Sequence, residues 1–196
     1  HAIFGNALQT SADAIYGARH VALKAGLPFE VPALTVNRLC GSGIQSIISA
    51  AQLIRLGEAT VVLAGGMESM SQAPHVIRGA RWGFRLGQGK LEDSLMAALF
   101  DPYCGAHMAE TAEKLARQNG IDREAQDEFA LRSQKLAAEA WAAGRFQDEV
   151  TPLEKCTRDD HMRPDSTIEA LRKLKPAFGK DGQVTAGNAS GIVDGG

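Results

Sequence analysis

Short apolar runs alternate with helix-type patterns over the first part of the chain. Residues 2–8, 31–36 and 60–64 are short and largely apolar, as strands buried in a sheet are. The segments between them, 11–24 and 44–54, carry apolar side chains at helical spacing. Strand, helix, strand, helix and strand in this order predict βαβ units and therefore a sheet covered by helices.

The two helical segments have recognisable ends and faces. Ser11 is a candidate N-cap for the first, and Gly26 followed by Pro28 predicts where it ends. The second is expected to bury one apolar stripe. That stripe consists of Ile44, Ile47, Ile48, Ala51 and Ile54.

Beyond residue 66 the pattern becomes more polar. Residues 67–75 are predicted to form a loop, in which Glu68 is interpreted as a loop charge rather than a buried, hydrogen-bonded carboxylate. Two long helical patterns follow, one over 107–118 and one from Asp122 as N-cap to residue 143. Their predicted faces are Met108, Thr111, Ala112 and Leu115 in the first, and Phe129, Leu136 and Ala140 in the second.

This change of pattern predicts two domains. Residues 1–66 with 181–196 are expected to form the core of an α/β domain, because the strand and helix patterns lie there. Residues 67–180 are expected to form an insertion domain on the sheet, since their main regular patterns are helical.

Cys40 lies where a predicted strand ends and a predicted helix begins. Gly41 and Gly43 supply small, permissive backbone at this junction, so another group can approach the sulfur closely. A helix N-terminus favours anions, and it therefore favours the thiolate, the nucleophilic form of cysteine. The predicted chemistry is nucleophilic attack on an acyl group. From the strand-turn-helix context alone, an inert cysteine packed as a small hydrophobe is an equally good interpretation.

Composition and charge argue against several other classes of protein. A formal net charge of -2 with interspersed signs gives no reason to expect nucleic acid as a partner. No apolar run approaches the roughly 18 residues that a membrane span needs. The histidines and cysteines lack zinc-type ligand spacing, so no metal site is predicted. Three cysteines at irregular spacing indicate no disulfide framework, and we expect a reducing, cytoplasmic compartment.

Both ends of the chain are abrupt. It begins with His1 rather than methionine, and residues 191–196 stop in a glycine-rich stretch. We therefore expect the chain to be a piece of a larger protein.

Four motifs follow one another along nearly the whole chain. They are Asn-Arg-Leu-Cys-Gly-Ser-Gly at 37–43, Gly-Gly-Met-Glu-Ser-Met-Ser-Gln-Ala-Pro-His at 65–75, His-Met with Thr-Ala-Glu within 107–113, and Val-Thr-Ala-Gly-Asn-Ala-Ser-Gly at 184–191. In this order they resemble the thiolases, the group of acetyl-CoA acetyltransferases and 3-ketoacyl-CoA thiolases. The resemblance implies an α/β, thiolase-like layered fold with a mixed sheet covered by helices and a helical insertion domain. It also implies that the second half of the fold is absent from this chain.

The resemblance implies a site as well. Cys40 matches the cysteine that takes the acyl group as a thioester, and its backbone N–H matches one donor of an oxyanion hole. Arg163 matches a contact to the nucleotide end of coenzyme A, and Ser190 a contact to its pantetheine arm. The full set of matching coenzyme A contacts is Leu99, His107, Met108, Arg163, Phe178 and Ser190. No permanently bound cofactor is implied, since coenzyme A is a substrate or product.

The implied reaction is acyl transfer through an acyl-cysteine intermediate, either thiolysis of a 3-ketoacyl-CoA or condensation of two acetyl-CoA molecules. The implied partners are acyl-CoA substrates and further copies of the chain, in a homotetramer or homodimer with residues 78–90 as a candidate contact region. The family's Gly-His-Pro, Cys-x-Gly and Asn-Glu-Ala-Phe motifs do not occur in the 196 residues. We therefore expect this chain alone not to turn over substrate. Two alternatives stay open: a 3-ketoacyl synthase and a non-catalytic coenzyme A-binding module.

Overall fold

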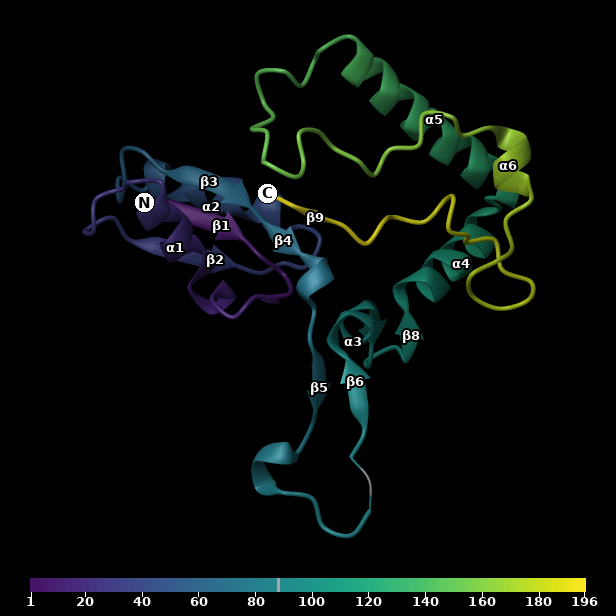
Figure 1. The fold of residues 1–196 in the computed structure, drawn as a ribbon, viewed down its shortest axis with the longest axis horizontal. Coiled ribbons are helices and arrows are strands. Elements are labelled where there is room, and N and C mark those ends of the chain that lie inside the picture. Colours follow the sequence, from purple (N-terminus) through teal and green to yellow (C-terminus); the bar gives the residue numbers. More distant parts are fainter. Residues whose placement is uncertain (88) are drawn as a thin grey trace. The chain divides into compact units, whose positions relative to one another are not determined.

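The computed structural model describes residues 1–87 and 89–196. Gln88, inside the predicted contact region 78–90, lies outside the described residues. The chain divides into two compact units, of which unit 1 is His1–Leu99 with Ile192–Gly196 and unit 2 is Phe100–Gly191. Figure 1 labels most of the helices and strands of both units.

Unit 1 is built on a three-stranded parallel sheet in the order β2-β1-β3. Its strands are β1 (Ala2–Gly5), β2 (Ala33–Val36) and β3 (Leu63–Gly66). All three predicted strands are confirmed, although each is shorter than expected and β3 begins three residues later than the predicted 60. Because the strands are parallel and in register, all three end at the same edge of the sheet.

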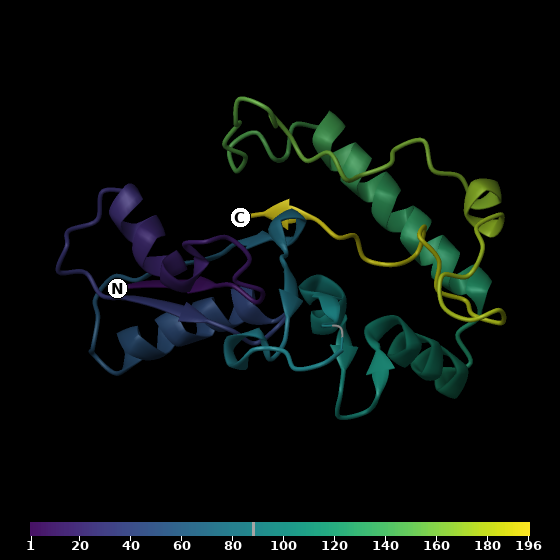
Figure 2. The same ribbon diagram turned by 60° about the horizontal axis from the view of Figure 1, so that its bottom comes forward.

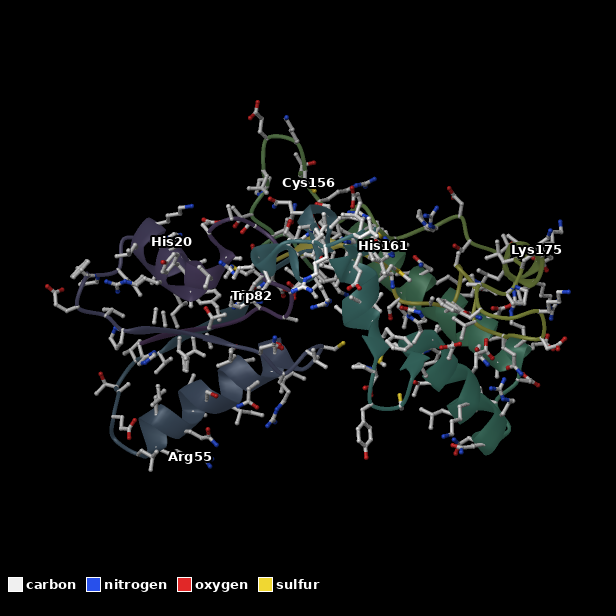
Figure 3. All side chains as sticks on the ribbon, turned by 90° about the horizontal axis from the view of Figure 1, so that it is seen from below. His20, Arg55, Trp82, Cys156, His161 and Lys175 are labelled. Atoms are coloured by element: carbon white, nitrogen blue, oxygen red, sulfur yellow. The ribbon has the colours of Figure 1, made fainter. Side chains whose placement is uncertain are left out.

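Two helices cover the sheet. Helices α1 (Gly17–Lys24) and α2 (Ser42–Arg55) lie on opposite faces, so unit 1 has a helix, sheet, helix layering (Figures 2 and 3). The predicted end of α1 is confirmed, because Gly26 is left-handed at φ 81°. The predicted start is wrong: the Ser11 hydroxyl donates to Asp13, and a 3-10 turn, Ala14–Tyr16, precedes α1.

Helix α2 does not bury the predicted isoleucine stripe. Its buried residues are Ser42, Ser46 and Ala50, whereas Ile44 and Ile47 are 68% and 61% exposed. The small side chains allow the helix backbone to come very close to β1, where Gly5 meets Ser42. The prediction failed because the residues that permit close approach, not the bulkiest ones, face the sheet.

The contact between Gly5 and Ser42 predicts a stability effect. A Cβ added at Gly5 would lie 2.5 Å from the carbonyl carbon of Ser42, so Gly5→Ala should destabilise the protein by about 2 kcal/mol through overpacking. Gly66 pairs with Gly5 across the sheet, and its Cβ would meet nothing closer than 3.6 Å. Gly66→Ala is therefore the matched control in urea unfolding. Equal unfolding midpoints for the two variants would contradict the prediction.

The segment after β3 is held by paired strands and by Asp194. β4 (Glu68–Ser69) pairs antiparallel with β9 (Asp194–Gly195), and a 3-10 turn, Met70–Gln72, follows β4. The Ser71 hydroxyl and N–H both donate to the Asp194 carboxylate. These bonds hold the pKa of Asp194 below its ordinary value, because they favour the charged carboxylate.

An antiparallel hairpin and a short helix complete unit 1. β5 (His75–Ile77) pairs with β6 (Leu91–Asp93), a 3-10 turn (Ala80–Trp82) lies between them, and α3 (Ser94–Leu99) follows. The Arg78 side chain donates to Glu92 at 2.8 Å across the hairpin. β5 and β6 therefore form an antiparallel hairpin that is held by backbone pairing and by this ion pair.

Unit 2 holds the two long helices that the sequence predicted. β7 (Phe100–Asp101) and β8 (Ala106–His107) form a small hairpin that leads into α4 (Met108–Asn119). α5 (Arg123–Ala142) begins with Asp122 as N-cap, whose carboxylate accepts from the Ala125 N–H, and α6 (Ile168–Arg172) follows later. Both predicted long helices and the Asp122 cap are confirmed.

The predicted buried faces of α4 and α5 are wrong. α4 buries Glu113 and Ala116, and Leu115 is exposed. α5 buries Asp127, and Phe129 is exposed. The physical reason is that both buried carboxylates accept hydrogen bonds from residues 183–188, so polar contacts decide which face turns inward.

The compact units differ from the expected domains. Residues 67–99 belong to the unit of the sheet, since β4 pairs with β9 there. Residues 181–191 belong to unit 2, where buried carboxylates hold them. The division into a core of 1–66 with 181–196 and an insertion of 67–180 stays a prediction.

Candidate functional site

Cys40 is exposed and lies between β2 and α2, two residues before the helix begins. Gly41 is the N-cap position of α2. The sulfur therefore lies where the sequence placed it, just before a helix N-terminus. Among residues 1–87 and 89–196, no hydrogen-bond acceptor is found for the Cys40 N–H, so this group can donate to a ligand.

The turn that carries Cys40 is fixed by short hydrogen bonds. The Ser42 hydroxyl accepts from the Arg38 N–H at 3.0 Å and donates to the Leu39 carbonyl at 2.6 Å. The Asn37 side-chain oxygen accepts from the Leu39 N–H at 2.9 Å. These bonds hold Leu39 at φ 49°, a left-handed conformation that is unusual for a residue other than glycine. Such strain persists only where the surroundings impose it, and it often accompanies a functional site.

The carboxyl edge of the sheet lies beside this turn. Gly5, Val36 and Gly66 end the three strands in register, and the turn with Cys40 follows Val36. Open α/β sheets bind ligands outside the carboxyl ends of their strands. Cys40 therefore lies at the edge where parallel sheets place their chemistry.

Glu68 organises the chain at the same edge. Its carboxylate accepts from the Asn6 side-chain amide at 2.9 Å, the Ala7 N–H at 2.9 Å and the Leu8 N–H at 3.0 Å. The interpretation of Glu68 as a mere loop charge is therefore wrong. It ties the loop after β1 to the loop after β3, because a carboxylate can satisfy several backbone donors at once.

Unit 2 brings three of the predicted coenzyme A contacts close together. The ring of His107 lies 6.0 Å from that of Phe178 and 5.1 Å from that of Phe100. Met108 is the next residue, and it begins α4. The Glu110 carboxylate accepts from the His107 N–H at 2.7 Å, which fixes the turn into the helix.

The Nδ1 atom of His107 is buried and has no hydrogen-bond partner among the described residues. The aromatic neighbours supply apolar contact, and the unpartnered nitrogen is enclosed within the described residues rather than open to solvent. His107 therefore lies in a largely apolar, aromatic environment, as residues that line ligand sites often do.

The other predicted contacts lie on separate elements. Arg163 and Ser190 are exposed in unit 2, and the Arg163 N–H donates to the Gln134 side chain at 2.7 Å. Leu99 ends α3 and belongs to unit 1 with Cys40. His107, Met108 and Phe178 thus lie close together. Arg163, Ser190 and Leu99 lie on other segments, and no contact among these three or with that group is described.

The buried polar residues that support these positions have roles that the sequence did not predict, although Glu113 stands within one of the four motifs. Glu113 is 4% exposed, and one of its oxygens accepts from the Gln183 and Val184 N–H groups at 2.6 and 2.7 Å. Asp127 is fully buried and bonds to Arg123 and to Asn188. Charged residues in amphipathic helices are mostly solvated, so burial of these carboxylates is not expected from the helix pattern. The Arg123 and Asp127 pair at i,i+4 was the one available signal.

An exposed cysteine before a helix, at the carboxyl edge of a parallel sheet, defines an α/β protein with a nucleophile-type cysteine. The sequence matches the family described as thiolase, N-terminal domain, over residues 1–196. The chain belongs to the thiolase N-terminal domain family.

Relatives of known name are similar over almost the whole chain. Human "3-ketoacyl-CoA thiolase, mitochondrial" is 54% identical, covering 98% of this chain and 51% of that protein. "Acetyl-CoA acetyltransferase" of Pseudomonas aeruginosa is 50% identical, covering 91% and 48%. The chain spans about half the length of the curated relatives that it matches.

Solved structures agree with the fold. The crystal structure of human mitochondrial 3-ketoacyl-CoA thiolase in complex with CoA is similar with a TM-score of 0.95 at 54% identity, covering 98% of this chain and 50% of that one. The Bacillus anthracis acetyl-CoA acetyltransferase structure is similar with a TM-score of 0.92 at 46% identity, covering 98% and 51%. The expected thiolase fold of mixed α/β content is confirmed.

None of the helices in the described part of the chain combines the length and the apolar character that crossing a bilayer requires. The names of several relatives include the word mitochondrial, so the expected cytoplasmic compartment is not confirmed.

Proposed function

We propose that the protein containing this chain is an acyltransferase of the thiolase type, with Cys40 as its nucleophile. The observation that carries the proposal is the geometry of Cys40: an exposed thiol before α2, beside a free backbone N–H, on a turn strained at Leu39. A helix N-terminus stabilises a thiolate, and a backbone N–H stabilises the oxyanion that forms when the thiolate attacks a carbonyl.

The proposed reaction proceeds through an acyl-cysteine. The Cys40 thiolate attacks the 3-keto carbon of a 3-ketoacyl-CoA, and the oxyanion collapses as the bond between carbons 2 and 3 breaks. Acetyl-CoA leaves once carbon 2 takes a proton, and the shortened acyl group stays on Cys40 as a thioester. A second coenzyme A thiol attacks the thioester and carries the acyl group away. The reverse sequence condenses two acetyl-CoA molecules.

The residues of unit 2 support coenzyme A as the substrate. We propose that His107, Met108 and Phe178 contact the pantetheine arm and the acyl group, because the rings of His107 and Phe178 lie 6.0 Å apart and Met108 follows His107 directly. Ser190 is proposed to contact pantetheine and Arg163 the nucleotide end, where a guanidinium suits a phosphate. Leu99 is proposed as an apolar contact. Coenzyme A acts as substrate and product, and no permanently bound cofactor is proposed.

Two other functions make different predictions. A 3-ketoacyl synthase would decarboxylate a malonyl donor, and a non-catalytic module would bind coenzyme A without acylation of Cys40. The strained turn at Leu39 and Cys40 favours a nucleophile over a pure binding module, since binding alone does not require a strained residue beside a thiol.

Intact mass spectrometry of the full-length protein after incubation with acetoacetyl-CoA tests the proposal. We expect the mass to rise by one acetyl group, and peptide mapping to locate the group on Cys40. Cys40→Ala should abolish the adduct, whereas Cys104→Ala, which removes another exposed thiol, should leave it unchanged. An adduct that persists in Cys40→Ala, or none in the unaltered protein, would overturn the proposal. Acylation by malonyl-CoA with loss of carbon dioxide would favour the synthase.

We further propose that copies of the protein associate, as a homodimer or homotetramer, through the hairpin between β5 and β6. Large apolar side chains are exposed along it, among them Trp82 at 89%, Phe84 and Leu86. Trp82 is labelled in Figure 3. Exposed apolar surface of this kind marks a contact with another protein, and a second copy is the partner that the proposal names.

Charge substitutions on the hairpin test this association. Trp82→Asp and Leu86→Asp should lower the oligomeric state of the full-length protein in light scattering coupled to gel filtration, because each would bury an unpaired charge. Tyr103→Asp, at another highly exposed aromatic residue, is the matched control and should leave the mass unchanged. An unchanged mass in both hairpin variants would contradict the proposal.

The compartment is also a proposal. Three free cysteines, all exposed, support a reducing compartment such as the cytoplasm. Localisation of the full-length protein by fluorescent fusion tests this.

A further inference from the structure

Asp127 is a fully buried carboxylate on a helix that is otherwise largely exposed. One oxygen accepts from the Arg123 side chain at 2.8 Å, and the other accepts from the Asn188 side-chain amide at 2.9 Å. Both oxygens therefore act as acceptors, and each faces a different element of unit 2. Burying a carboxylate lowers the stability of a protein unless both oxygens accept hydrogen bonds. The segments around Asp127 must therefore keep their donors in place.

Asn188 links Asp127 to the rest of the loop 183–191 through hydrogen bonds. Its amide nitrogen donates to Asp127 and to the Gln183 carbonyl at 3.0 Å, and its oxygen accepts from the Thr185 N–H at 2.7 Å. The side chain can be oriented in only one way, because its oxygen faces a donor and its nitrogen faces two acceptors. The turn is closed by the Ala189 N–H, which donates to the Thr185 carbonyl at 3.0 Å.

Arg123 extends the same network to α6. Its guanidinium donates to the Leu171 carbonyl at 2.6 Å and to the Leu174 carbonyl at 3.2 Å. Leu171 and Leu174 also lie against Gly187, where an added Cβ would come within 2.6 Å of either side chain. α5, the end of α6 and the loop 183–191 are therefore held together around the ion pair of Arg123 and the buried Asp127.

Ser190 lies between Asn188, which belongs to this hydrogen-bond network, and Gly191, which contacts His161. Asn188 is two residues before it, and Gly191 follows it directly. The imidazole of His161 packs so closely on Gly191 that any Cβ there would overlap the ring. Figure 3 labels His161. Ser190 itself is exposed, and no hydrogen bond to its hydroxyl is found in the described residues, so the loop is held on both sides while the hydroxyl stays available.

We propose that Asp127 is a positioning residue for coenzyme A: acting through Asn188, it sets the loop 183–191 so that the Ser190 hydroxyl meets the pantetheine arm. This inference rests on the proposed function, from which the contact of Ser190 comes. Asp127 does not touch the substrate. Its role is to hold in place a hydroxyl that would otherwise have to be ordered on binding.

Asp127→Asn tests the inference in the full-length protein. The amide has nearly the volume of the carboxylate, but its NH₂ group must face either Arg123 or Asn188, both of which are donors. We expect the Kd of coenzyme A in calorimetry, and its KM in thiolysis, to rise about tenfold. The kcat at saturating coenzyme A should stay within about twofold, since the nucleophile is untouched. Glu128→Gln, at the exposed neighbour, should change neither constant.

A small thiol separates positioning from a general structural role. 2-Mercaptoethanol lacks both pantetheine amides and the nucleotide, so Asp127→Asn should not change its KM as acyl acceptor. A similar rise in KM for both thiols would mean that Asp127 supports the fold as a whole, and it would overturn the inference. An unchanged Kd for coenzyme A would overturn it as well. If Asp127→Asn fails to fold, Asn188→Ala decides by the same criteria, because it removes the link and leaves the pair of Arg123 and Asp127 intact.

The outcomes distinguish the inference from the proposed function. If Cys40 is never acylated and Asp127→Asn still weakens coenzyme A binding tenfold, the catalytic proposal fails and the positioning role stands. If Cys40 is acylated and the Kd is unchanged, the positioning role fails alone.

Discussion

Replacing Cys40 by alanine is expected to lower the rate of thiolysis by the full-length protein about 10⁴-fold or more, because the acyl-cysteine can no longer form. Cys40→Ser should be nearly as inactive. Its hydroxyl has almost the same position, but it ionises far less readily than a thiol and no group of its own turn acts as a base toward it. Steady-state assays with acetoacetyl-CoA and coenzyme A measure both variants.

Binding separates the loss of a nucleophile from the loss of a fold. Both Cys40 variants should bind coenzyme A with the Kd of the unaltered protein, since the proposed coenzyme A contacts other than Leu99 lie in unit 2. Cys104→Ala and Cys156→Ala replace the remaining exposed thiols and should keep full activity. Activity above about one per cent of the original in Cys40→Ala would show that another group carries the reaction.

The strands of the sheet and the ends of the helices could be predicted from sequence because their signals are local. Apolar runs predicted β1, β2 and β3, and the caps at Gly26 and Asp122 lie where the pattern placed them. These features depend on the residues within one or two turns, through backbone conformation and capping bonds. The start of α1 failed for a related reason, since Ser11 bonds to Asp13 rather than to the helix backbone.

The buried faces of the helices could not be predicted, because they depend on distant partners. α2 turns Ser42, Ser46 and Ala50 toward the sheet, since Gly5 leaves room for close approach there. α4 turns Glu113 inward, where backbone N–H groups far along the chain need an acceptor. Apolar periodicity identifies a helix, but it does not show which neighbour lies against which face.

In the candidate site, too, features set by neighbouring residues could be predicted, and those set by distant partners could not. Cys40 was predicted from its junction, and the turn around it matches that prediction in position. Glu68 was misread, because its three donors lie in the loop after β1, some sixty residues earlier in the chain. The pairing of Asp127 with Asn188, which stands in the motif 184–191, was not predicted, because the two residues are 61 apart and become partners only in the folded unit. Candidate residues within a motif can be proposed from the sequence, whereas the residues that support them through distant contacts cannot.

Replacing Glu113 by alanine is expected to destabilise the loop 183–191 by about 3 kcal/mol. One carboxylate oxygen accepts from the Gln183 and Val184 N–H groups at 2.6 and 2.7 Å, and each buried donor left without a partner costs about 1–3 kcal/mol. The second oxygen lies 3.8 Å from the Arg117 guanidinium, an attraction that the variant also loses. Hydrogen exchange read by NMR should show the protection of these two amides falling about 100-fold.

Glu113→Gln is the matched control for the alanine variant. Its amide oxygen can still accept from both N–H groups, and only the charge is lost, so the cost should be about 1 kcal/mol. Protection at Gln183 and Val184 should therefore fall less than tenfold in this variant. Equal losses in the two variants would mean that the charge, through Arg117, holds the loop rather than the pair of backbone hydrogen bonds. Retention of full protection in Glu113→Ala would mean that Asp127 and Asn188 hold the loop alone.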